Sequence, residues 1–170
     1  DKVEWLFPGV DLSRFRPTDH GLEGKSNPKV LFATAPRTVE ELEGRGVPLL
    51  LTAAQATPEV HYHLLYRRWR TGYTSLHTTQ KLIARQELRN VTVTDSIVAD
   101  MPAVYNQHHF TIVPYTRPDG GKECPNSLIE GLACGLPALV SSACRIADFV
   151  ERQRCGVVFD PTPLGLVNAI

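Results

Sequence analysis

Six short apolar runs, separated by segments with helical spacing, constrain the fold of this chain most strongly. The runs span residues 30–34, 60–66, 91–94, 110–114, 138–142 and 157–159. Strands that are apolar throughout and alternate with helices indicate a parallel sheet covered on both faces, with right-handed crossovers. The sequence therefore predicts one doubly wound α/β domain over residues 1–170.

Helical patterns fill the gaps between these runs. Residues 47–56 carry Pro48 in the first turn, where a missing backbone N–H is tolerated. Residues 73–88 have apolar side chains at helical spacing, and 146–154 end before Gly156. The shorter segments 101–107 and 164–170 complete the alternation. We expect residues 34–47, after the first run, to form a loop.

Composition excludes some functional classes. The chain has 18 Lys and Arg and 18 Asp and Glu, so no net basic charge points to nucleic acid. No apolar segment is long enough to cross a bilayer. Cysteines at 124, 134, 144 and 155 lack C-x-x-C pairing, so we expect reduced thiols in a cytoplasmic protein. Because the chain begins with Asp1 and has no leader, we interpret it as a piece of a longer protein.

Histidines occur in two pairs. His61 and His63 alternate and share one face of a strand, while His108 and His109 precede another strand. Neither pair has an Asp, Glu or Cys at ligand spacing, so we interpret them as surface or edge histidines rather than metal ligands.

Basic residues are frequent in the loops that follow the predicted strands. In a doubly wound sheet, ligands bind beyond the carboxyl ends of the strands, so these loops are the candidate site. An anionic ligand would use such residues, although a solvated rim is the alternative for about half of them. The residues are Arg37, Arg45, Arg67, Arg68, Arg70, Arg117 and Lys122. The Gly-rich signatures of nicotinamide enzymes and nucleotide triphosphatases are absent from the sequence.

Residues 122–142 combine a helix start, an acidic residue and a buried strand. We expect Asn126 to cap a helix that Gly135 and Pro137 end. The N–H groups at such a start attract phosphate, and Glu130, one turn along, can accept hydrogen bonds from a sugar diol. An ordinary capped helix with a solvated glutamate is the alternative.

Five segments occur in the order seen in one enzyme family. They are PGVDLSRFRP (8–17), RGVPLLLTAA (45–54), NVTVTDSI (90–97), CPNSLIEGLACGLPALVSS (124–142) and FVERQRCGVVFDP (149–161). Together they resemble the C-terminal, donor-binding domain of retaining GT-B glycosyltransferases of group 1, also called glycosyltransferase family 4. The resemblance implies a Rossmann-like domain, the C-terminal half of a two-domain fold whose N-terminal acceptor domain is absent from this chain.

The resemblance implies a nucleotide-diphosphate sugar as the donor, bound in a cleft between the two domains. Glu130 falls on the family glutamate that binds the ribose hydroxyls. Pro125, Asn126 and Ser127 fall where the helix start meets the diphosphate and the sugar. Arg45 takes the place of a lysine that neutralises the diphosphate.

Two further positions differ from the family pattern. Arg37, within the residues TAPR, takes the place of the arginine that follows the first strand in the family. Lys122 stands where the family often has an acidic residue that contacts the sugar. Either the adjacent Glu123 serves through a loop shift, or Lys122 itself contacts a sugar hydroxyl or an acidic sugar. We interpret Lys122 and Glu123 as the candidate catalytic pair, diverged rather than lost.

The predicted reaction is retaining transfer without a metal or another cofactor, because the sequence has no Asp-x-Asp motif. Arg37, Arg45 and the helix start would stabilise the leaving diphosphate. The acceptor, a glycan, a lipid-linked sugar or a small molecule, would be held by the missing domain, which would also carry any membrane association. We expect the fragment alone to be inactive. A non-catalytic module that binds an anion or a partner is the alternative, and a sugar-nucleotide epimerase is disfavoured by residues 125–130.

Overall fold

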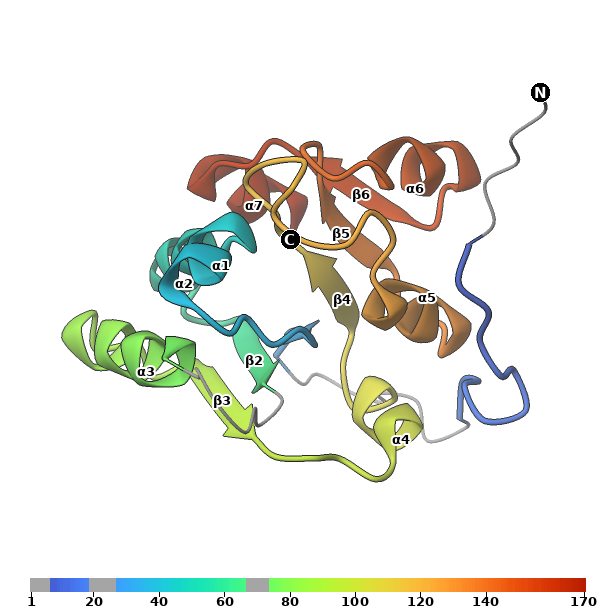
Figure 1. Ribbon diagram of the computed structural model, residues 1–170, viewed down its shortest axis with the longest axis horizontal. Coiled ribbons are helices and arrows are strands. Elements are labelled where there is room, and N and C mark those ends of the chain that lie inside the picture. Colours follow the sequence, from blue (N-terminus) through green and yellow to red (C-terminus); the bar gives the residue numbers. More distant parts are fainter. Residues whose placement is uncertain (1–6, 19–26, 67–73) are drawn as a thin grey trace.

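Six parallel strands form the centre of the computed structural model, which describes residues 7–18, 27–66 and 74–170 (Figure 1). Their order in the sheet is β3-β2-β1-β4-β5-β6. The strands are β1 (Lys29–Phe32), β2 (His61–Tyr66), β3 (Val91–Asp95), β4 (Phe110–Val113), β5 (Ala138–Ser141) and β6 (Gly156–Phe159). All six predicted strands are confirmed, and their ends lie within two residues of the prediction.

Helices cover both faces of the sheet, as the sequence predicts. One face packs against α1 (Val39–Gly44), α2 (Val47–Ala56), α3 (Ser75–Arg85) and α7 (Pro163–Ala169). The other face packs against α4 (Met101–Tyr105), α5 (Asn126–Ala133) and α6 (Ala147–Gln153). Figure 1 shows these two groups on opposite sides of the strands. The fold is therefore a doubly wound α/β domain.

Alternate side chains of the inner strands enter the cores on the two faces of the sheet. Val30 and Phe32 of β1 pack with the α2 side, whereas Leu31 packs with α4 and the end of α5. Because successive side chains of a strand point to opposite faces, an apolar run can fill both cores at once.

The helix α1 corrects the sequence prediction, which assigned residues 34–47 to a loop. Thr38 caps it, accepting a hydrogen bond from the Glu41 N–H at 3.2 Å, and the Glu41 carboxylate accepts from the Arg37 N–H at 2.9 Å. This Thr-x-x-Glu arrangement closely resembles a capping box, which is a sequence-level signal for a helix start. The helix has only 6 residues, so hydrophobic periodicity does not reveal it, and this capping signal is the evidence for it in the sequence.

The start of α5 is a second correction. Asn126 was predicted as the N-cap, but Pro125 occupies that position with extended dihedral angles, and Asn126 is the first helical residue. Proline has no side-chain acceptor, so no side chain caps this helix. The first N–H groups of α5 are consequently left to other partners.

Within the described residues, no helix has the length and apolar character needed to cross a membrane. The four cysteines are free thiols, and Cys124, Cys134 and Cys144 are buried.

Candidate functional site

A cleft of about 470 Å³ lies at the carboxyl ends of the strands, where β1 and β4 are neighbours. The chain leaves β1 toward β2 and leaves β4 toward β5, so the connections diverge at this point. Such a switch point is where doubly wound sheets bind ligands. Its lining residues are Ala33, Thr34, Ala35, Arg45, Leu65, Tyr66, Ser96, Ile97, Val98, Met101, Tyr115, Lys122, Pro125, Asn126 and Ser127.

The lining divides into a cationic part and an apolar part. Arg45, Lys122 and the uncapped start of α5 provide positive charge and N–H donors. Leu65, Ile97 and their neighbours Val98 and Met101 provide an apolar wall. Neither Asp nor Glu occurs among these described lining residues. The cleft therefore suits a ligand with one anionic end and one flat or apolar end.

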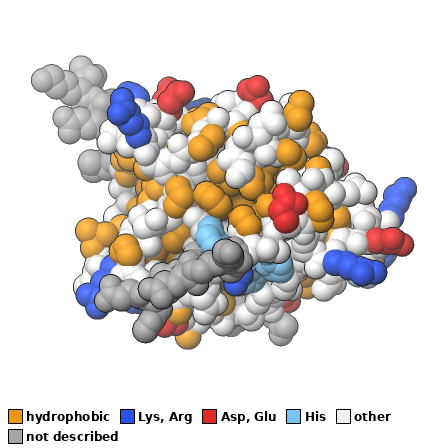
Figure 2. Space-filling view, turned by 180° about the vertical axis from the view of Figure 1, so that it is seen from behind, with side chains coloured by type: hydrophobic (Ala, Val, Ile, Leu, Met, Phe, Trp, Pro, Cys, Tyr) orange, Lys and Arg blue, Asp and Glu red, His pale blue; other side chains and the backbone are white. Residues whose placement is uncertain are grey.

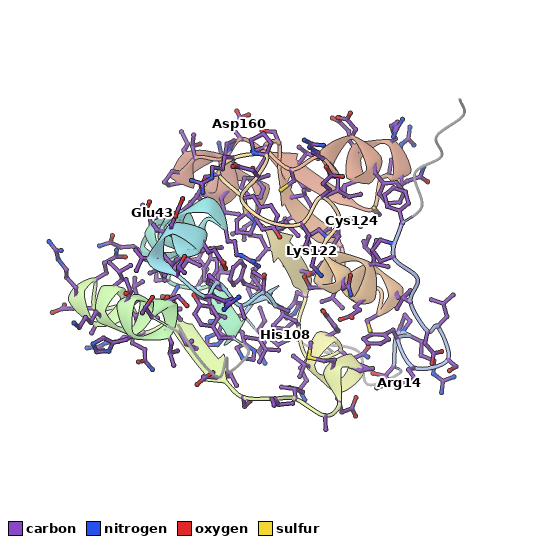
Figure 3. The ribbon with its side chains drawn as sticks, in the orientation of Figure 1. Arg14, Glu43, His108, Lys122, Cys124 and Asp160 are labelled. Carbon is purple, nitrogen blue, oxygen red and sulfur yellow. The ribbon has the colours of Figure 1, made fainter. Side chains whose placement is uncertain are left out.

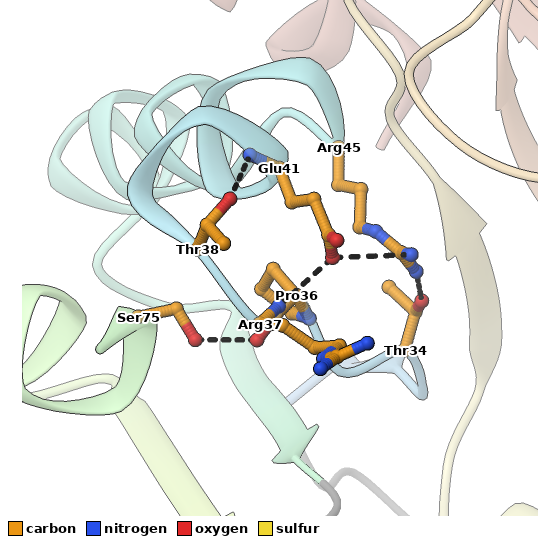
Figure 4. Close-up of polar contacts among 7 residues, drawn as sticks. All are labelled: Thr34, Pro36, Arg37, Thr38, Glu41, Arg45 and Ser75. Atoms are coloured by element: carbon orange, nitrogen blue, oxygen red, sulfur yellow. Dashed lines mark hydrogen bonds and ion pairs between the residues drawn. The ribbon is translucent and has the colours of Figure 1, made fainter. Parts of the chain in front are cut away.

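Arg45 is held over the cleft by two contacts from its own side of the sheet. Its Nη1 donates to Thr34 Oγ1, and its Nη2 lies 3.5 Å from Glu41 Oε2 (Figure 4). Its side chain is 22% exposed, and Nε is buried without a partner among the described residues. The guanidinium is thus fixed at one edge and retains donors for a ligand.

Gly46 explains why Arg45 can lie there. Its φ of 77° turns the chain sharply between α1 and α2, and a Cβ at this position would lie 1.8 Å from the Pro114 carbonyl oxygen. Only glycine allows this combination of left-handed backbone and close approach. The α1–α2 junction therefore sits directly against the end of β4.

Arg37 lies beside this cluster but not in the cleft lining. Its backbone N–H donates to Glu41 (Figure 4). Its carbonyl oxygen accepts from the N–H of Thr74 at 3.1 Å. The side chain of Ser75, at the start of α3, donates to the neighbouring Pro36 carbonyl oxygen. The described contacts of this segment therefore tie α1 to α3.

Lys122 and Glu123 point to different places. Lys122 lines the cleft near the start of α5 (Figure 3). Glu123 instead accepts a hydrogen bond from Arg145 and lines a second cavity with Asp119 and Gly121. The structure thus brings Lys122 together with Arg45 and the start of α5, and it separates Glu123 from them.

Glu130 lies on the second turn of α5, one turn after Asn126 and Ser127, and is not among the residues that line the cleft. Its Oε2 accepts a hydrogen bond from the Tyr105 hydroxyl at 2.8 Å. Burial raises the pKa of Glu130, and the hydrogen bond from Tyr105 and the charge of Arg14 act against that rise. Sequence reasoning missed Tyr105, since nothing in the pattern of residues 101–107 connects it with a residue 25 positions away.

The other basic residues of the loops lie elsewhere. Arg117 pairs with Asp119 at 3.0 Å and with Glu40 at 4.0 Å, outside the cleft lining. Arg67, Arg68 and Arg70 lie outside the described residues.

His63 and His108 correct the prediction of surface or edge histidines. β2 is an internal strand, His108 is only 6% exposed, and the two rings stack with centroids 5.1 Å apart. His108 Nδ1 donates to the Val104 carbonyl oxygen at 2.7 Å, so His108 Nε2 accepts from His63 Nδ1 at 3.1 Å. His63 Nε2 then accepts from Thr94 at 2.8 Å. This pattern of donors and acceptors describes two neutral rings. Burial lowers the pKa of both histidines, that of His108 to about 4, and so favours the neutral forms.

Histidine side chains are also visible from behind the molecule (Figure 2). They lie near the middle of that face, below hydrophobic side chains, while Lys and Arg lie mainly at its edge. In the part of the chain that the structure describes, no group of three or more His, Cys, Asp or Glu is placed to hold a metal ion.

Comparison with known proteins gives a consistent result. The sequence model of a family described as glycosyl transferases group 1 matches residues 37–170. A search of curated proteins returned no match.

Several solved structures share the fold. Sucrose-phosphate synthase from Thermosynechococcus elongatus is 20% identical with a TM-score of 0.77, over 95% of this chain and 40% of that one. HepE from Anabaena, solved with UDP and glucose, is 19% identical with a TM-score of 0.75, over 94% of this chain and 44% of that one. The C-terminal domain of the group 1 protein LpcC from Francisella tularensis is 12% identical with a TM-score of 0.72, over 94% and 85% of the two chains. This chain thus spans less than half the length of the first two structures and most of the isolated C-terminal domain.

Proposed function

Because this chain belongs to the glycosyl transferases of group 1 and has the fold of a GT-B C-terminal domain, we propose that its cleft binds the nucleoside diphosphate of a nucleotide-sugar donor. One observation carries the proposal. At the topological switch point, Arg45, Lys122 and the uncapped start of α5 line the same cleft, and no carboxylate lies among the described lining residues.

The diphosphate fits the cationic part of the cleft. Arg45 offers guanidinium donors that Thr34 and Glu41 already orient, so little side-chain entropy is lost on binding. The N–H groups of Asn126 and Ser127 add the positive end of the α5 dipole. Breaking the anomeric C–O bond leaves negative charge on the diphosphate, and these groups would stabilise that charge without a metal ion.

The nucleoside fits the rest of the cleft. Ile97 is 81% exposed at the rim and, with Val98 and Met101, offers an apolar surface for the face of a base. Glu130, on the same side of α5 as α4, would accept hydrogen bonds from the ribose hydroxyls. HepE, a structural relative solved with UDP, supports this type of ligand.

We further propose retaining transfer of the sugar, in which Lys122 contacts the sugar. Arg37 and Glu123 would act after their segments move toward the cleft. An N-terminal domain of the GT-B type would complete the cleft and hold the acceptor. The reaction would take place in the cytoplasm or, through a membrane contact of that domain, at the cytoplasmic face of a membrane. This chain alone would bind the donor weakly and transfer little sugar, because water reaches the diphosphate in an open cleft.

Calorimetric titration with UDP, GDP and ADP, in EDTA and without added metal, tests the proposal. We expect one diphosphate to bind saturably, and the corresponding monophosphate and nucleoside to bind progressively more weakly. Absence of saturable binding by all three at millimolar concentration would refute it. Transfer itself is tested in a protein that joins this sequence to an N-terminal GT-B domain, where NMR of the product should show the anomeric configuration of the donor.

A further inference from the structure

Tyr105 and Glu130 form a polar contact between a buried phenol and a half-buried carboxylate. Tyr105 ends α4, has no exposed surface, and donates its hydroxyl hydrogen to Glu130 Oε2 at 2.8 Å. A hydrogen bond from a neutral hydroxyl to a carboxylate is charge-assisted and strongly directional. A buried phenol hydroxyl must find a partner, and here the partner is a carboxylate, whereas buried Tyr62 and Tyr66 bond to threonine hydroxyls.

The Tyr105 ring has little freedom to move. It packs with Leu31, Leu65, Cys134 and Leu136, and its centroid lies 6.2 Å from that of Phe15. Asp100 caps the preceding turn of α4 by accepting from the Ala103 N–H. Asn106, which follows Tyr105, donates to the carbonyl oxygens of Pro102 and Arg16 at 2.9 and 3.1 Å. The hydroxyl is therefore fixed in space by the core and by both sides of α4.

The direction of the hydrogen bond is equally fixed. Burial and the neighbouring charge of Glu130 raise the pKa of Tyr105 far above its usual value, so the phenol stays protonated and always donates. Glu130 Oε2 is thereby occupied, and Oε1 remains as the acceptor for a ligand. The same hydrogen bond opposes the rise of the Glu130 pKa that burial causes, so it also keeps the carboxylate ionised.

We propose that Tyr105 is a positioning residue for ribose recognition: it holds Glu130 Oε2 so that Oε1 faces the sugar diol of a bound nucleotide. This rests on the ribose role of Glu130 in the proposed function. Met101, one α4 turn before Tyr105, lines the cleft directly, so α4 carries both the wall of the nucleoside site and the residue that orients its acceptor.

A purely structural role makes different predictions from a positioning role. If Tyr105 only fills the core, its hydroxyl can be removed with a cost in stability and no change in ligand selectivity. If it positions Glu130, removal should weaken ligands that carry the ribose diol more than ligands that lack a 2′-hydroxyl. It should also move the pH dependence of binding, because the Glu130 pKa rises when the hydrogen bond is lost.

The test is Tyr105→Phe in this chain, compared with Glu130→Gln and with Tyr62→Phe as the matched control. Tyr62 is also buried, at 1% exposure, and its hydroxyl bonds to Thr57 at 2.8 Å in the core on the opposite face of the sheet. Dissociation constants are measured for UDP, GDP and ADP and for their 2′-deoxy counterparts between mildly acidic and neutral pH.

We expect Tyr105→Phe to weaken the ribonucleotide by about tenfold and the deoxynucleotide by less than about threefold. As the pH is lowered, nucleotide binding by Tyr105→Phe should weaken at a higher pH than binding by the unmodified chain. Tyr62→Phe should change neither the selectivity for the ribonucleotide nor this pH dependence. Selectivity and pH dependence that survive in Tyr105→Phe, while Glu130→Gln loses selectivity, would overturn the positioning role and leave the proposed function intact. If the unmodified chain binds none of the three diphosphates, the proposed function itself fails.

Discussion

Replacing Arg45 by alanine tests the anionic part of the cleft most directly. The substitution removes the guanidinium, its bond to Thr34 and its ion pair with Glu41. Both contacts are close to the surface, so their loss should cost at most about 1 kcal/mol of folding stability. The thermal midpoint should therefore fall only slightly, and the effect on binding can be measured in a folded protein.

The size of the effect follows from the environment of the side chain. A hydrogen bond that involves a charged group contributes about 1.5 to 3 kcal/mol. Arg45 is 22% exposed and lies in a cleft that is open to water, so we expect the lower half of that range. A loss of about 2 kcal/mol corresponds to a dissociation constant about 30-fold higher. Arg45→Lys should fall between the two, because it keeps the charge but loses the planar fork.

The assay is calorimetric titration with the diphosphate that binds the unmodified chain most tightly. Arg117→Ala is the control, since it removes the same charge from a residue that pairs with Asp119 and does not line the cleft. At physiological salt the control should change the dissociation constant by less than about twofold. Equal losses in both variants would mean that only long-range charge matters, and an unchanged constant in Arg45→Ala would show that the guanidinium does not meet the ligand.

Three further predictions concern stability and metal dependence. Because folding lowers the pKa of His108 from 6.5 to about 4, the stabilising contribution of the neutral ring is present above pH 6.5 and is lost as the pH falls, by about 2 kcal/mol near pH 5. Urea unfolding at several pH values should show this fall in the free energy of unfolding. The fall should be smaller in His108→Asn. Gly46→Ala should lower the free energy of unfolding by at least about 2 kcal/mol, because the new Cβ would clash with Pro114 and the backbone is left-handed. Gly9→Ala is the control and should cost little, because its Cβ has no atom within 4 Å. Similar losses of stability in the two variants would contradict this account. Diphosphate affinity should be the same in EDTA and in Mg²⁺, and a dissociation constant that rises sharply in EDTA would show that a metal ion takes part.

The sequence was sufficient for the sheet because the four inner strands, β2, β1, β4 and β5, are largely buried on both faces. Short apolar stretches such as Ala138–Val140, bounded by Gly, Pro or Ser, are typical of strands that are buried on both faces. The short helix α1 escaped this reasoning, since 6 residues give less than two turns of periodicity and the capping signal at Thr38 was the only clue.

The residues of the candidate cleft that could be predicted are those that follow a strand in the sequence. Arg45, Lys122 and the start of α5 all follow strands, and parallel topology places the carboxyl ends of those strands together. Contacts between distant segments could not be predicted in this way. The bonds from Tyr105 to Glu130 and from His63 to His108 join residues 25 and 45 positions apart, and hydrophobic periodicity carries no information about such pairs.

The negative charge of Glu41 opposes the binding of an anion, since its carboxylate lies 3.5 Å from the Arg45 guanidinium that would bind the ligand. Its Oε2 also accepts from the Arg37 N–H, and it is 38% exposed, so part of its charge is already compensated and part is screened by water. A diphosphate carries more charge than one carboxylate and can be reached by the remaining Arg45 donors while Thr34 and Glu41 keep theirs. The ion pair therefore weakens the attraction of Arg45 for an anion but holds its guanidinium in place before the ligand binds. Since no carboxylate is among the described residues that line the cleft, this arrangement favours a diphosphate over a smaller anion.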